Sequence, residues 1–416
     1  MQDSPVVSFE LRVPTEDEFV AFSTPVFRGF GDPNPSPEEL EDERRMWEPD
    51  RSLGALDQGE WIGGTGAYSF DMTLPGGTTA PAAGVTMVGV ATTHRRQGVL
   101  TALMDRQLDD VVARGECLAV LTASETSIYG RFGYGWSADM AAVELATARS
   151  AFRTPPAAPG RLRIVATKDA AAPMAGAYER CRRLRPGTLT RSDKYWNMVV
   201  GDPDRRRGGA SALFVVVHDD AVGQPDGYAT YRIKEKWEHG LPDNTVVITD
   251  LYGVGPEVEA TLWRFLLDID LATRVVGRAR PVDDPLRWRL IEPRRLRTTE
   301  ISDFLWTRIL DVPAALAARH YGADDGLVLE VVDRFRPESG GVFRLDGGVD
   351  GAACKPTDDA PDLTLGADDL GAMYLGGVPP RTLAAAGRIT EHTSGALQRA
   401  DALFVMPPAP FNATMF

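Results

Sequence analysis

The chain has 416 residues, of which 43% are hydrophobic and 25% are charged, a composition typical of a folded globular protein. This length exceeds what one hydrophobic core supports and predicts two or three domains. The formal net charge of −14 disfavours nucleic acid as the main partner and favours a cationic substrate.

Membrane, export and metal signals are weak in this sequence. No apolar run approaches the roughly 20 residues that span a membrane, and residues 1–5 lack the basic and apolar regions of a signal peptide. We therefore expect a cytoplasmic protein with no membrane partner. The three cysteines, Cys117, Cys181 and Cys354, are far apart and odd in number, which predicts reduced thiols. No histidine has metal-ligand spacing with another candidate ligand, so no metal is expected.

The first segment, predicted to span residues 1–153, begins with two helix starts. Thr15-x-x-Glu18 is a candidate capping box, and Ser36-Pro37-Glu38-Glu39 is a second one with proline at the first helical position. Strands are predicted around residues 61–70 and 85–90, with a turn at residues 74–77 between them.

The stretch from Val88 to Leu100 is the most informative part of the chain. An apolar strand passes through a short basic turn that contains Gly98, and apolar residues at helical spacing follow at once. A strand that enters a helix through such a loop presents unpaired backbone N–H groups and the positive end of the helix dipole. We therefore predict an anion site suited to a pyrophosphate, with Arg95 and Arg96 at its rim.

A second buried strand is predicted at residues 117–124, after a helix stop at Gly115. It is followed by a short helix that carries Tyr129. A phenol with a pKa near about 10 stays protonated at neutral pH and can supply a proton to a thiolate. Tyr129 is therefore a candidate general acid.

The order strand, basic turn, helix, strand and tyrosine-bearing helix resembles the GNAT acetyltransferases. Their pyrophosphate loop has Arg or Gln, two residues, Gly, one residue, and then Gly or Ala, and Arg95-x-x-Gly98-x-Leu100 departs only at Leu100. Thr-His-Arg-Arg-Gln-Gly-Val-Leu and Ser-Ile-Tyr-Gly-Arg-Phe-Gly-Tyr-Gly resemble the enhanced intracellular survival (Eis) branch more closely. Eis-like chains also end in phenylalanine, as this chain does at Phe416.

The resemblance implies acetyl-CoA as co-substrate and direct transfer to an amine. It assigns the general base to the terminal carboxylate of Phe416, a group whose ordinary pKa of about 3.3–3.7 requires burial or a relaying water. The strand at Val88–Val90 would direct N–H groups at the acetyl carbonyl. The coenzyme-binding positions implied are Val88, Gly89, Val90, Arg95, Arg96, Gln97, Gly98, Val99, Leu100, Thr101, Ser124 and Glu125.

A proline-rich linker at residues 154–160 precedes a middle segment, predicted to span residues 161–299. A strand at residues 246–254 and a helix at residues 257–271 repeat the strand–turn–helix pattern of the first segment. The intervening Gly255-Pro256 has no basic residue, and the proline lacks a donor N–H. We expect a degenerate GNAT-like lobe without a CoA site.

The last segment, predicted to span residues 300–416, has strands at residues 327–333 and 341–345 and a helix at residues 368–374. It resembles the sterol-carrier-protein-like domain that closes Eis chains. The predicted fold class is therefore α/β (α+β), with two tandem GNAT-like lobes and this third domain.

The function expected is N-acetylation of primary amines on polycationic small molecules such as aminoglycosides. Two alternatives stay open at this point: acetylation of protein lysines, and a lipid-binding or scaffold protein with inert lobes. The resemblance also implies a homohexamer.

Overall fold

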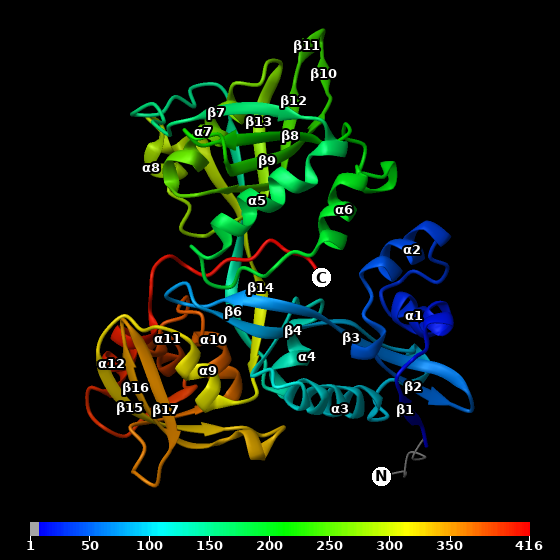
Figure 1. Ribbon diagram of the computed structural model, residues 1–416, viewed down its shortest axis with the longest axis vertical. Coiled ribbons are helices and arrows are strands. Elements are labelled where there is room, and N and C mark those ends of the chain that lie inside the picture. The colour runs from blue at the N-terminus through cyan, green and yellow to red at the C-terminus, as the bar shows by residue number, and fades with distance from the viewer. Residues whose placement is uncertain (1–7) are drawn as a thin grey trace.

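The computed structural model describes residues 8–416, which form two lobes and a third domain (Figure 1). The first lobe contains strands β1 (Glu10–Arg12), β2 (Leu53–Asp57), β3 (Glu60–Thr73), β4 (Thr79–Val90), β5 (Leu118–Leu121) and β6 (Gly135–Ala146), and helices α1 (Phe19–Gly29), α2 (Pro37–Met46), α3 (Val99–Ala113) and α4 (Thr126–Tyr129). Both predicted capping boxes are present, one a turn before α1 and one at the start of α2. The predicted amphipathic helix is α3, which buries Leu103, Leu108 and Val111.

The second lobe repeats this plan. Its strands are β7 (Arg161–Val165), β8 (Phe214–Asp219), β9 (Pro225–Lys234), β12 (Asn244–Gly253), β13 (Ala272–Arg280) and β14 (Leu296–Ile309), its helices α5 (Ala171–Arg182), α6 (Asp193–Gly201), α7 (Pro256–Leu267) and α8 (Leu286–Arg289), and its short ribbon β10 (Trp237–Glu238) and β11 (Leu241–Pro242). Helix α7 ends four residues before the predicted Leu271, which has a left-handed φ of 65° that a helix cannot contain.

The two lobes share one 12-stranded sheet and exchange their last strands. The sheet order is β1-β2-β3-β4-β5-β14-β6-β13-β12-β9-β8-β7. The last strand of the second lobe, β14, therefore lies beside β5 of the first, and the last strand of the first lobe, β6, lies beside β13 of the second. Figure 1 shows β14 and β6 crossing the middle of the molecule. The exchange makes each lobe depend on the other for its complete sheet.

The third domain packs beside the first lobe (Figure 1). Its sheet has the order β17-β16-β15-β18-β19. The elements are α9 (Val312–Ala318), β15 (Asp325–Val332), β16 (Gly341–Gly348), β17 (Gly351–Pro356), β18 (Leu363–Gly366), α10 (Ala367–Met373), α11 (Pro380–Ala385), β19 (Ile389–Glu391) and α12 (Ala396–Phe404). The predicted neighbouring strands, β15 and β16, pair antiparallel. After α12 the chain returns to the centre of the molecule, between the two lobes.

The structure can be compared with the predicted domain boundaries, cysteine state, membrane spans and metal sites. The boundary predicted at residue 300 falls inside β14, and residues 154–160 contain no helix or strand. Cys117, Cys181 and Cys354 are free. Between residues 8 and 416, no helix has the length and apolar character needed to cross a bilayer, and no cluster of His, Cys and carboxylate side chains is arranged to hold a metal.

Candidate active site

Strands β4 and β5 run parallel and then separate. Their pairing ends at Gly84 and Val120, although β4 continues to Val90. A bulge in β4 then shifts its register with β3, and Met87 at this bulge has a positive φ of 52°. A bulge bends a strand and re-aims its backbone groups. The result is a wedge-shaped opening in the sheet, with the Val88 region on one side and Ser124 on the other.

The predicted anion turn follows the open end of β4. Arg96 and Gly98 have positive φ values of 62° and 85°, and Gly98 is the N-cap of α3. The first N–H groups of a helix have no partner within the helix, and among residues 8–416 no side chain caps them here. His94 links the turn to β2, because its Nε2 is 3.2 Å from a carboxylate oxygen of Asp57.

A cavity of about 940 Å³ covers this helix end and the adjoining wedge. Of the predicted coenzyme residues, those that line it are Val88, Gly89, Val90, Arg95, Arg96, Gly98, Val99, Leu100, Thr101, Ser124 and Glu125. Gln97 is not part of the wall: its side chain donates a hydrogen bond to the Thr93 carbonyl at 3.1 Å. The large Leu100, where the family pattern has a small residue, packs its side chain against the first-lobe core.

The donor set of this cavity suits a pyrophosphate. A Cβ at Gly98 would meet nothing within 4 Å, so the space above the helix end is open to a ligand. Arg95 and Arg96 are exposed, and no carboxylate in the described part of the chain pairs with either of them. Uncapped N–H groups, an open approach and two unpaired cations are what a diphosphate requires.

Tyr129 lies where this cavity meets a second one of about 400 Å³. Its side chain is only 6% exposed and packs edge-on against Tyr134, with ring centroids 6.0 Å apart. Burial raises the pKa of Tyr129 to about 12, with a smaller contribution from the negative charge of Glu125. The phenol therefore holds its proton at the junction of the two cavities.

Phe416 lines the second cavity, opposite the wedge. Its ring packs against Phe70 with centroids 5.1 Å apart, and the Thr122 hydroxyl donates a hydrogen bond to a main-chain carboxylate oxygen of Phe416 at 3.4 Å. Asn412 and Thr414, just before it, are fully buried. The structure thus brings the two predicted catalytic residues to one cavity.

The same cavity carries negative charge from the second lobe. Asp303 of β14 lines it, and the Trp306 indole donates a hydrogen bond to Asp303 at 2.7 Å. Asp139 of β6 is directly opposite Asp303 in the strand pair. Burial raises the pKa of Asp139, and the nearby charge of Asp303 adds to the rise. Asp303 therefore places a carboxylate at the wall of this cavity, which favours a cationic ligand.

The corresponding place in the second lobe holds only a small cavity of about 230 Å³, and Arg280 forms part of its wall. Arg280, at the end of β13, is fully buried and donates a hydrogen bond across to the Leu251 carbonyl of β12 at 2.8 Å. Glu259 at 3.1 Å and Asp284 at 2.9 Å neutralise it. This guanidinium occupies the place where the first lobe opens between its parallel strands.

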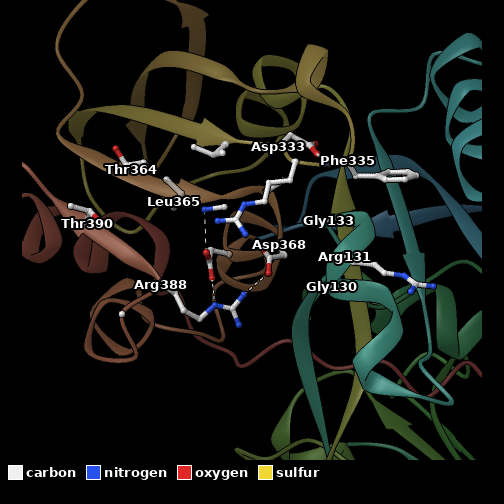
Figure 2. Close-up of a pocket in the computed structure, with 16 residues that line it drawn as sticks. Gly130, Arg131, Gly133, Asp333, Phe335, Thr364, Leu365, Asp368, Arg388 and Thr390 are labelled. Carbon is white, nitrogen blue, oxygen red and sulfur yellow. Dashed lines mark hydrogen bonds and ion pairs between the residues drawn. The ribbon is translucent and has the colours of Figure 1, made fainter. Parts of the chain in front are cut away.

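A third cavity, of about 700 Å³, lies between the first lobe and the third domain. Figure 2 shows Arg131 on its first-lobe side and Arg388, paired with two aspartates of α10, on the other. Arg388 is 2.6 Å from Asp368 and 2.5 Å from Asp369. Arg131 also lines the coenzyme cavity, so the two spaces are neighbours. Neither predicted catalytic residue lines this third cavity.

Several wall residues were not predicted from the sequence. Phe30, which follows α1, lines both the cavity of about 940 Å³ at the start of α3, called here the coenzyme cavity, and the cavity of about 400 Å³ beside Phe416, called here the acceptor-side cavity. The signal in the sequence was a large apolar residue between two glycines, Gly29 and Gly31. In the structure the Phe30 side chain is 61% exposed. Asp303 had no such signal, since only the strand exchange brings it to this lobe.

This geometry, a parallel strand pair opened at a bulge above an uncapped helix end, defines a GNAT acyltransferase. Residues 10–137 and 187–309 each match a family described as an acetyltransferase (GNAT) domain, and residues 312–413 match a sterol carrier protein domain. The fold class predicted from the sequence is confirmed.

Individual relatives narrow the class. An uncharacterized N-acetyltransferase of Streptomyces coelicolor is 44% identical over 97% of this chain and 99% of its own length. The N-acetyltransferase Eis of Mycobacterium tuberculosis is 36% identical over 84% of this chain and 85% of its own length. The crystal structure of Eis1 from Mycobacterium abscessus superposes with a TM-score of 0.87 at 33% identity, covering 98% of this chain and all of that one. The chain belongs to the Eis family of GNAT N-acetyltransferases.

Proposed function

We propose that this N-acetyltransferase moves the acetyl group of acetyl-CoA to primary amines of polycationic small molecules, of which aminoglycosides are the example. The observation that carries the proposal is the position of Tyr129, which lines both the coenzyme cavity and the acidic cavity that ends at Phe416. A donor in one cavity and an acceptor in the other would meet at this phenol.

The coenzyme side of the site is built from backbone donors. The N–H groups at the start of α3, with Arg95 and Arg96, would hold the pyrophosphate. Ser124 and Glu125 would border the pantetheine arm. The Val88 N–H, re-aimed by the bulge, would donate to the acetyl carbonyl oxygen and stabilise the charge that develops there.

The proton transfers follow from the two catalytic residues. As the amine nitrogen bonds to the acetyl carbon and the carbon–sulfur bond breaks, Tyr129 donates its hydroxyl proton to the departing thiolate. The Phe416 carboxylate accepts the proton that the amine loses, directly or through a water. Burial raises the pKa of Tyr129 to about 12, and the same desolvation would raise the pKa of a coenzyme thiol held beside it.

The acceptor class follows from charge. Asp303 and the Phe416 carboxylate both border the acceptor-side cavity, and the whole chain carries a formal charge of −14. Local and overall negative charge raise the concentration of a polycation at the site. A neutral or acidic acceptor would gain nothing from this field.

A substrate panel tests the proposal. Thiol release from acetyl-CoA is followed with aminoglycosides, simple diamines, lysine peptides and uncharged hydroxyl compounds. We expect turnover with the polycationic amines well above that with single-lysine peptides. Turnover confined to lysine peptides would show that the protein acetylates protein lysines instead. Absence of turnover with every amine would contradict the proposal.

The homohexamer and the cytoplasmic location implied by the resemblance remain predictions. Sedimentation velocity of the purified chain checks the first, and a single species of monomer mass would contradict it.

A further inference from the structure

Arg191 is a buried cation that the acetyl-transfer site described so far does not use. It lies in the second lobe, just before α6, and its side chain is 1% exposed. Its guanidinium carbon lies 4.1 Å from the ring centroid of Tyr178, 4.9 Å from that of Tyr195 and 5.2 Å from that of Trp196. Such an aromatic cage holds a planar cation in one orientation.

Two polar partners fix one end of this guanidinium. Arg191 Nη1 is 2.5 Å from a carboxylate oxygen of Asp250 and donates a second hydrogen bond to the Tyr228 hydroxyl at 2.9 Å. The Tyr228 hydroxyl donates in turn to Asp250 at 2.6 Å. Asp250 therefore neutralises the buried charge, and the arginine is rigidly held inside its own lobe.

Among the described residues Arg191 Nη2 has no hydrogen-bond partner, whereas Nε bonds to the segment that leads to Phe416. This Nε donates a hydrogen bond to the Thr414 hydroxyl at 2.9 Å, two residues before Phe416. Asn412 and Thr414 also bond to each other, because the Asn412 amide donates to the Thr414 carbonyl and the Thr414 N–H donates to the Asn412 side chain. The chain just before the terminal carboxylate is thus a closed turn fastened to a fixed cation.

The segment just before Arg191 pairs with β3 of the first lobe. Leu189 forms an antiparallel bridge with Met72 of β3, and the Thr190 N–H donates to the Asp71 carbonyl at 3.0 Å. The preceding residue of β3, Phe70, is the one against which the Phe416 ring packs. One short segment therefore ties the second lobe, β3 and the chain terminus into a single unit.

We propose that Arg191 is a positioning residue for acetyl transfer, holding Thr414 so that the Phe416 carboxylate stays in the acceptor cavity. The inference rests on the proposed role of that carboxylate as the base. It also gives the second lobe, whose own opening is narrowed by Arg280, a part in the reaction.

Removing the Thr414 hydroxyl alone tests the link. Thr414→Val keeps the shape of the side chain and breaks only its hydrogen bonds. We expect kcat to fall by about tenfold to a hundredfold, because small displacements of a catalytic group have effects of this size. The Kd for acetyl-CoA should stay unchanged, and Thr414→Ser, which restores the hydroxyl, should restore most of the turnover.

The control removes an equivalent hydroxyl elsewhere in the second lobe. Thr261 is half-buried in α7, and its hydroxyl donates a hydrogen bond to the Glu257 carbonyl of the same helix at 3.0 Å. Thr261→Val should leave kcat unchanged. Melting temperatures of all variants are compared, and Thr414→Ala, too small to clash, replaces Thr414→Val if the valine prevents folding. Equal losses in the Thr414 and Thr261 variants would overturn the inference.

A double variant separates this inference from the proposed base. A Gly-Ser extension after Phe416 displaces the carboxylate and should lower kcat by itself; added to the extended chain, Thr414→Val should cause little further loss. If the extension lowers kcat and Thr414→Val does not, the positioning role of Arg191 is wrong, and the Phe416 carboxylate is still supported as the general base. If the two losses multiply, Thr414 acts elsewhere and the positioning role is also wrong. If the extension has no effect on kcat, both the role of the Phe416 carboxylate as base and the positioning role of Arg191 are wrong.

Discussion

Tyr129 and Phe416 line one cavity of about 400 Å³, although they are far apart in the sequence. Tyr129 reaches it from α4 of the first lobe, and Phe416 reaches it after the chain has passed through the second lobe and the third domain. The site is therefore complete only when all three parts of the chain are folded together.

The pH dependence of turnover follows from the buried phenol. Burial raises the pKa of Tyr129 to about 12, so the group is protonated, and able to act as an acid, throughout the range from pH 7 to pH 10. We expect kcat/KM to rise with pH as the acceptor amine loses its proton, and then to level off without an alkaline decline up to pH 10. Initial rates in overlapping buffers check this. A decline with a midpoint below pH 10 that disappears in Tyr129→Phe would show that the phenol ionises earlier.

The coenzyme turn is tested by two glycines at opposite ends of α3. Gly98 before the helix and Gly115 after it both have positive φ, 85° and 78°, and an added Cβ at either meets nothing within 4 Å. Valine at either position imposes backbone strain of at least about 1–2 kcal/mol. We expect Gly98→Val and Gly115→Val to lose similar melting temperature, while only Gly98→Val weakens acetyl-CoA binding, by about tenfold or more. Equal binding by both variants would remove the turn from the coenzyme site.

The second lobe should bind no coenzyme of its own. Arg280 spans the gap between β12 and β13, and Pro256 occupies the first position of α7, where the first lobe has a donor N–H. We therefore expect one acetyl-CoA per chain in a calorimetric titration of the wild-type protein. Two equivalent sites per chain would contradict the assignment of Arg280.

Local sequence pattern predicted the turn and the helix that form the candidate coenzyme half of the site. The turn at Arg95–Leu100 and the helix that follows depend on neighbouring residues, because glycine conformations and helical periodicity are set within a few positions. The same patterns in the second lobe revealed its repeat and the obstructed loop at Gly255-Pro256. These features needed no long-range contact to be recognised.

The acceptor half depends on contacts between distant segments. Nothing near Asp303 indicates that β14 leaves its own lobe to pair with β5, and nothing near Arg191 indicates a bond to Thr414. The end of helix α7 at Leu267 was also missed, because the apolar Ile269 and Leu271 extend the periodic pattern past the real helix end. Strand exchange and burial of the terminal segment are properties of the assembled fold.

The most direct test of the catalytic account is the turnover of Tyr129→Phe beside that of Tyr134→Phe. Tyr134 packs edge-on against Tyr129 and is fully buried without lining either cavity, so its substitution controls for packing. We predict that Tyr129→Phe lowers kcat by about a hundredfold or more while the Kd for acetyl-CoA stays near that of the wild type, and that Tyr134→Phe retains its turnover. Wild-type kcat in a folded Tyr129→Phe protein would contradict the account.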